Sequence, residues 1–219
     1  MIGKIQRVIS ILRLLVERLT GLEGMQVNLL TCLFVSILII LFIVLVGKVL
    51  DTIQRYLMMG IVKISSVKMA TIITMYLTFP GVMVHELNHA LMCLVTGAKI
   101  LKITLFHPDK QTGVLGSVKY MTYGKPFKQR IQLSFISSAP VLFGYIDILV
   151  LFRLLVYFNP NWLISTLMSY LIISIFLHMT MSSVDIKHYF KGALFILPVV
   201  YLITYYMVFV CIMRYTGPM

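Results

Sequence analysis

The chain has 219 residues, of which 60% are hydrophobic and 12% charged, and its mean hydropathy is +0.98. This composition excludes an ordinary soluble domain and indicates an integral membrane protein. The 19 lysines and arginines outnumber the 7 acidic residues, but they are dispersed and no RNA or DNA motif accompanies them, so they favour orientation in a lipid bilayer and no nucleic-acid partner is expected.

Residues 1–22 are predicted to form an amphipathic helix. Apolar residues recur at three-to-four spacing from Ile2 to Leu15, and basic residues such as Arg7 and Arg13 lie between them. A helix of this kind would lie along an anionic membrane surface. Packing of the same helix against another part of the protein is the alternative interpretation.

Five largely uncharged runs are each long enough to cross a bilayer, which takes about 20 residues of helix. They are residues 27–47, 69–97, 131–158, 162–182 and 193–213. Gly97 is a candidate C-cap at the end of the second run. There is no internal repeat, so we expect residues 1–219 to form one all-α, polytopic membrane domain of about five transmembrane helices.

The second run contains His85-Glu86-Leu87-Asn88-His89, an H-E-x-x-H pattern. Residues four apart lie on one face of a helix, so both imidazoles can reach one metal ion while Glu86 lies beside it. Two histidines and a carboxylate that takes a proton from a water molecule on the metal are typical of a zinc hydrolase. Chance predicts roughly 0.002 such matches for this composition. The alternative to a metal site is that both histidines are core residues whose hydrogen bonds are satisfied within the protein, beside a glutamate.

Residues 99–130 differ from the rest of the chain and are predicted to form two or three short strands at the membrane surface. Residues 100–106 partly alternate between apolar and polar positions, and residues 116–123 are β-branched and aromatic. Gly113, Gly116 and Gly124 punctuate the segment. A solvated basic loop is the alternative interpretation.

The distribution of basic residues predicts the orientation. If all five runs cross the membrane, most lysines and arginines fall on the side of the N-terminus, the 99–130 segment and the loop expected at 183–192. That side should be cytoplasmic, with the C-terminus on the other side. His85 and His89 would then lie roughly 12–18 Å below the cytoplasmic surface.

A catalytic zinc requires a third protein ligand. No glutamate follows Glu86, and the positions for an extended H-E-x-x-H-x-x-G-x-x-H pattern hold Met92 and Val95 instead. The remaining downstream candidates are His107, Asp109, Asp147, His178, Asp185 and His188. The predicted side of the membrane and the depth within it leave three of these residues as possible third ligands. They are Asp185 at the cytoplasmic end of the fourth run, His178 at a depth compatible with that of the two histidines, and the deeper Asp147.

Residues 79–91, which contain the H-E-L-N-H pattern, and Thr96-Gly97-Ala98-Lys99 resemble the site-2 protease superfamily of intramembrane metalloproteases. In that superfamily an H-E-[LF]-[GS]-H-[AG] helix precedes a small β element and an aspartate ligand in a later span. The resemblance therefore implies Asp185 as the third ligand, and residues 181–187 match loosely. Asn88 replaces the usual small residue, and the N-P-x-P-x-x-D-G context of the aspartate is missing.

The sequence thus predicts a zinc-dependent intramembrane endopeptidase that acts on a membrane-associated protein or peptide within the lipid bilayer. His85, His89 and Asp185 would bind Zn²⁺, and Glu86 would be the general base. The substrate would be held extended along an edge strand of the 99–130 segment. The alternative functions are a zinc-binding membrane protein without proteolytic activity, transporter-like in kind, and an inactive membrane scaffold.

Overall fold

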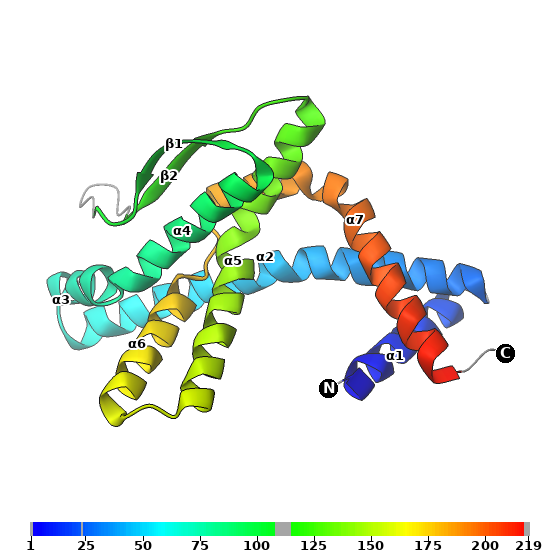
Figure 1. Cartoon of the computed structure of the whole chain (residues 1–219), viewed down its shortest axis with the longest axis horizontal. Coiled ribbons are helices and arrows are strands. Elements are labelled where there is room, and N and C mark those ends of the chain that lie inside the picture. The colour runs from blue at the N-terminus through cyan, green and yellow to red at the C-terminus, as the bar shows by residue number, and fades with distance from the viewer. Residues whose placement is uncertain (1, 23, 108–114, 217–219) are drawn as a thin grey trace. The chain divides into compact units, whose positions relative to one another are not determined.

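A computed structural model describes residues 2–22, 24–107 and 115–216, and Figure 1 shows that they are mostly helical with one small sheet. The helices are α1 (Ile2–Thr20), α2 (Met25–Ile64), α3 (Val67–Thr71), α4 (Phe79–Thr96), α5 (Pro126–Phe158), α6 (Trp162–His178) and α7 (Ser183–Thr216). The strands are β1 (Lys99–Thr104) and β2 (Ser117–Met121). Of the predicted amphipathic segment 1–22, Ile2–Thr20 is helical as α1.

Three helices in the described ranges are long and apolar enough to cross a membrane. They are α2, α5 and α7 as far as Met207, with hydropathies of 3.3, 2.1 and 1.5 over their most apolar windows. α6 is a shorter apolar helix. These helices contain the predicted runs 27–47 and 131–158 and most of the run 193–213, and they are compatible with a membrane protein.

The predicted run 69–97 is not one continuous helix. It consists of α3, a π-helical stretch at Ile72–Leu77, and α4. Pro80 stands in the first turn of α4, where its missing N–H breaks no helical hydrogen bond. α4 ends as predicted, because Gly97 adopts the left-handed conformation with φ 73°.

The prediction of a loop at residues 183–192 is also wrong, because these residues form the first turns of α7. α6 ends at His178, four residues earlier than the end of the predicted run. Ser182 and Asp185 have the spacing of a helix-capping pair, and their side chains bond to each other's backbone N–H groups at the start of α7. Asp185 therefore lies in a helical first turn.

The chain divides into two compact units, one of residues 1–42 with 194–219 and one of residues 43–193. All of the candidate site residues lie in the second unit. The expectation of one domain over residues 1–219 stays a prediction. In the second unit α4, α5 and α6 pack against one another, and both strands pack on α4 (Figure 1).

Close helix packing in this unit depends on small residues. A Cβ atom at Gly81 of α4 would overlap the backbone carbonyl group of Ser174 in α6. The Gly81 N–H donates to Ser174 Oγ at 2.8 Å, which joins the two helices at the same point. Met92 and Cys93 of α4 and Ile136 of α5 are buried in a core that also contacts the sheet.

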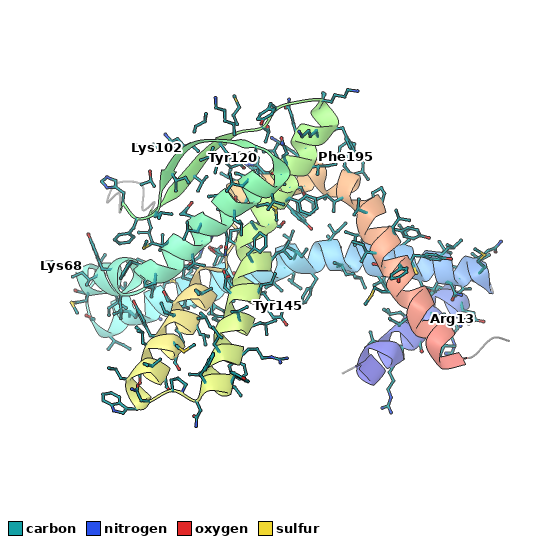
Figure 2. The ribbon with its side chains drawn as sticks, viewed as in Figure 1. Arg13, Lys68, Lys102, Tyr120, Tyr145 and Phe195 are labelled. Carbon is teal, nitrogen blue, oxygen red and sulfur yellow. The ribbon has the colours of Figure 1, made fainter. Side chains whose placement is uncertain are left out.

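The predicted β element is confirmed as a two-stranded antiparallel sheet. Ile103 pairs with Val118 and Thr104 with Ser117. Val118 and Tyr120 are partly buried against the core of α4 and α5, whereas Lys102 and Lys119, which pair across the strands, are exposed. Figure 2 shows Tyr120 on the helix side of the hairpin and Lys102 on its outer side. Asp109 and Gly113 lie outside the described residues.

The predicted orientation can be tested across α5. In a background without native cysteines, single cysteines at Lys119 and at Asn161 should react with a membrane-impermeant reagent from opposite sides of the membrane, with position 119 cytoplasmic. Both positions are exposed, so access through the protein does not limit the reaction. Labelling of both from one side would show that α5 does not cross the bilayer.

Candidate metal centre

Two histidines of α4 and one aspartate of α7 form the centre of the candidate site. The Nε2 atoms of His85 and His89 lie 3.2 Å apart, and Asp185 Oδ1 lies 4.0 Å from His89 Nε2. One ligand atom from each residue falls within 4.8 Å of the others, so the group could hold a metal ion. The structure thus brings together His85, His89 and Asp185, the predicted ligand set.

The second ring nitrogen of each histidine contacts a backbone carbonyl group. His85 Nδ1 donates to the carbonyl oxygen of His178 at 2.7 Å, and His89 Nδ1 donates to that of Ile136 at 2.8 Å. Because a carbonyl oxygen only accepts hydrogen bonds, each Nδ1 carries the hydrogen, and the neutral ring has its lone pair on Nε2. Metal-binding histidines are commonly oriented in this way.

The carbonyl group that holds His85 is available because α6 ends at His178. The last carbonyl groups of a helix lack intrahelical donors and must find other partners. The imidazole of His178 is turned elsewhere, with Nε2 2.8 Å from Thr78 Oγ1. His178 therefore contributes to the site through its backbone, whereas the sequence had suggested its side chain.

The distances between ligand atoms can be compared with those of a zinc ion. Tetrahedral coordination with bonds of about 2.0–2.1 Å separates nitrogen ligands by about 3.3 Å. The two Nε2 atoms, 3.2 Å apart, match this value, and the distance to Asp185 Oδ1 is longer at 4.0 Å. Two lone pairs facing each other at 3.2 Å repel unless a cation lies between them. The two histidines therefore have a spacing that suits a metal ion, and Asp185 is near enough for the group to hold one.

Asp185 is held by the start of its own helix. Asp185 Oδ2 accepts hydrogen bonds from Ser182 Oγ at 2.6 Å and from the Ser182 backbone N–H at 3.0 Å. The backbone N–H of Asp185 donates to Ser182 Oγ at 3.1 Å, which completes a capping box. One carboxylate oxygen is thereby fixed by the cap, and the other is directed at His89.

Ser182→Ala is expected to weaken metal binding without removing a ligand. Loss of a residue that orients a ligand typically lowers metal affinity about 10–100-fold. The measurement is zinc affinity in competition with a chelator. Ser183→Ala is the matched control, because Ser183 is adjacent and exposed. Equal zinc affinities for the two variants would contradict a positioning role for the cap.

Glu86 is buried in the same cavity, on the side of the hairpin. The cavity has a volume of about 590 Å³, and residues from α4, β2 and α7 line it, including His85, His89 and Asp185. A Cβ atom at Gly116 would lie 2.8 Å from Glu86 Cγ, so the absence of a side chain there lets the hairpin approach Glu86. The backbone N–H of Val118 donates to the Glu86 carboxylate. Glu86 thus lies beside the potential ligands, in reach of the same cavity.

Asp147, the third ligand candidate, has a different partner. Asp147 Oδ2 accepts a hydrogen bond from Asn88 Nδ2 at 3.0 Å. Asn88 is buried on α4. The pair explains both polar residues at once, because each satisfies the other between α4 and α5.

Two further polar residues line the cavity: Tyr120, which the sequence did not single out, and His188, which was among the downstream ligand candidates but was not retained. Tyr120 lines it from β2, and His188 lines it from α7, one turn after Asp185. Burial, and then the negative charge of Asp185, raise the pKa of Tyr120 to about 12, so its phenol stays protonated and can donate a hydrogen bond. The i, i+3 spacing of Asp185 and His188 was the available signal for His188.

Comparison with known proteins found no matching protein-family model, no matching curated protein and no matching solved structure.

Proposed function

We propose that this chain is a zinc-dependent intramembrane endopeptidase that cleaves a membrane-associated protein or peptide. The observation that carries the proposal is the convergence of two histidine Nε2 atoms and Asp185 Oδ1 in one cavity that also contains Glu86. Imidazole and carboxylate ligands suit zinc, and three of them leave a coordination position for water or substrate. The motif resemblance to site-2 proteases points to the same chemistry.

The potential metal ligands, Glu86 and the hairpin would have separate tasks in this reaction. Zinc, when bound, supplies a Lewis acid that polarises a carbonyl group and lowers the pKa of water to about 7. Glu86 takes the proton of the attacking water and returns it to the amine that leaves. The Val118 N–H would hold the Glu86 carboxylate on the hairpin side, which the small Gly116 lets approach.

The hairpin supports a peptide as the substrate. A membrane helix must unwind before a peptide bond can be attacked, and its freed backbone groups need new partners inside a low-dielectric environment. β2 lines the cavity, and the sheet has only the strands β1 and β2 in the part of the chain described. A substrate strand that pairs with the hairpin would be held extended beside Glu86.

The proposal includes the location of the active site. The chain would be an integral, multi-pass membrane protein, with the N-terminus, the hairpin and the start of α7 on the cytoplasmic side. Its partners would be the lipid bilayer and a membrane protein or peptide substrate, and no nucleic acid. The excess of basic residues in these segments supports this orientation.

Metal content and cleavage together test the proposal. Purified full-length chain in detergent should hold about one zinc per chain, His85→Ala should hold none, and only the wild type should cleave membrane peptides in a chelator-sensitive manner. Zinc without cleavage by a chain with intact Glu86 would favour the alternative, a zinc-binding membrane protein that is transporter-like or a scaffold. A wild type without metal would overturn the proposal.

A further inference from the structure

α5 contains a proline in its interior, at position 140, although the helix continues from Pro126 to Phe158. Proline has no backbone N–H, so the carbonyl group four residues earlier loses its helical donor. That carbonyl group belongs to Ile136. Pro140 and Ile136 are both fully buried, so water does not replace the missing donor.

The carbonyl group released by Pro140 is the one that holds a metal-ligand candidate. His89 Nδ1 donates to the carbonyl oxygen of Ile136 at 2.8 Å. We propose that Pro140 is a positioning residue for the metal centre: it frees this carbonyl group from α5 and thereby fixes the tautomer and orientation of His89. The inference rests on the metal-binding part of the proposed function and is independent of proteolysis.

The steric effect of the proline acts in the same direction as the missing donor. The pyrrolidine ring clashes with the carbonyl group of residue i−4, which tilts that carbonyl away from the helix axis. Such a tilt turns the Ile136 oxygen from the interior of α5 towards the neighbouring α4, where His89 lies. A residue with an N–H at position 140 would draw the oxygen back to the axis, because it restores the helical hydrogen bond.

The chain provides a matched control for this substitution. Pro198 also lies in the interior of a helix, α7. The carbonyl group that it frees belongs to Leu194, whose side chain is 72% exposed, and neither residue lines the metal cavity. Pro198→Ala therefore makes the same chemical change without a histidine partner.

The test measures zinc affinity of the full chain in detergent, by competition with a chelator. Pro140→Ala should bind zinc about 10–100-fold more weakly than the wild type, which is the usual effect of losing a ligand's hydrogen-bond partner. Pro198→Ala should bind zinc as the wild type does. Thermal unfolding of metal-free Pro140→Ala should remain cooperative, which shows that the variant folds.

An ester at position 140 separates positioning from packing. Lactic acid, introduced there by nonsense suppression, has the alanine side chain but no N–H, so it leaves the Ile136 carbonyl group free. This variant should recover most of the zinc affinity that Pro140→Ala loses. Equal affinities of the alanine and ester variants, or wild-type affinity in Pro140→Ala, would overturn the inference.

Two further results distinguish the possible failures. A wild type that binds no zinc refutes the proposed function, whereas a wild type that binds zinc as tightly as Pro140→Ala refutes this inference alone. If the variants at position 140 do not fold, ¹⁵N NMR of the histidine-labelled, zinc-loaded wild type decides. His89 Nδ1 should then be protonated and hydrogen-bonded, and an unprotonated Nδ1 would overturn the inference.

Discussion

Asp185→Ala should remove stoichiometric zinc from the purified chain, as His89→Ala should. Both residues present a ligand atom to the same point, with Asp185 Oδ1 4.0 Å from His89 Nε2. Losing one of three protein ligands weakens metal affinity by orders of magnitude, more than the 10–100-fold typical of an orienting residue. The measurement is zinc per chain after dialysis against a weak chelator.

Asp147→Ala and His178→Ala are the matched comparisons, because the sequence left both open as the third ligand. Asp147→Ala should keep its zinc, since Asp147 bonds to Asn88. His178→Ala should keep it as well, because the backbone carbonyl group that holds His85 survives the substitution. Zinc retained by Asp185→Ala and lost from either of the other two would show that the ligand assignment is wrong.

The pattern of two histidines four residues apart made the metal helix predictable from the sequence. On α4 this spacing places both Nε2 atoms within 3.2 Å of each other. The hairpin could equally be predicted from the sequence, because alternating apolar and polar residues, together with glycines, mark its strands between residues 99 and 123. Both signals are local, so one segment of sequence was sufficient in each case.

The third ligand depends on long-range structure, and periodicity could not decide it. All three candidates lie within apolar runs or near the ends of such runs: Asp185, His178 and Asp147. Only the fold shows that the side chains of His178 and Asp147 are hydrogen-bonded elsewhere. The start of α7 was missed for a related reason. The run predicted at residues 162–182 extends past the end of α6, because hydropathy averages over the break between α6 and α7.

The orientation of the ligands was also beyond the sequence, because two backbone carbonyl groups and a helix cap provide it. The end of α6 holds His85, the Ile136 carbonyl of α5 holds His89, and the cap of α7 holds Asp185. Each arises where a helical hydrogen-bond pattern is interrupted. Breaks in three helices therefore supply the polar partners that an apolar chain otherwise lacks.

Glu86→Gln should reduce turnover at least about a hundredfold while zinc content stays at the wild-type level. Glutamine keeps the shape of the side chain beside Gly116, and its carbonyl oxygen can still accept the hydrogen bond of the Val118 N–H. A neutral amide cannot take a proton from water, however, and loss of a general base typically costs 10²–10⁴-fold. The reaction is measured as initial rate of cleavage of a membrane peptide at saturating zinc.

Glu17→Gln, the same substitution in α1, is the control for the change of charge and should leave both zinc content and turnover unaltered. The two readouts of Glu86→Gln separate the roles that a carboxylate in this cavity can have. If zinc is lost together with activity, Glu86 is a ligand, and the set of His85, His89 and Asp185 is incomplete. If both zinc and turnover persist, proton transfer does not pass through Glu86, and a hydrolase mechanism on this helix is refuted. Only retained zinc with lost turnover agrees with a general base held beside the metal by the hairpin.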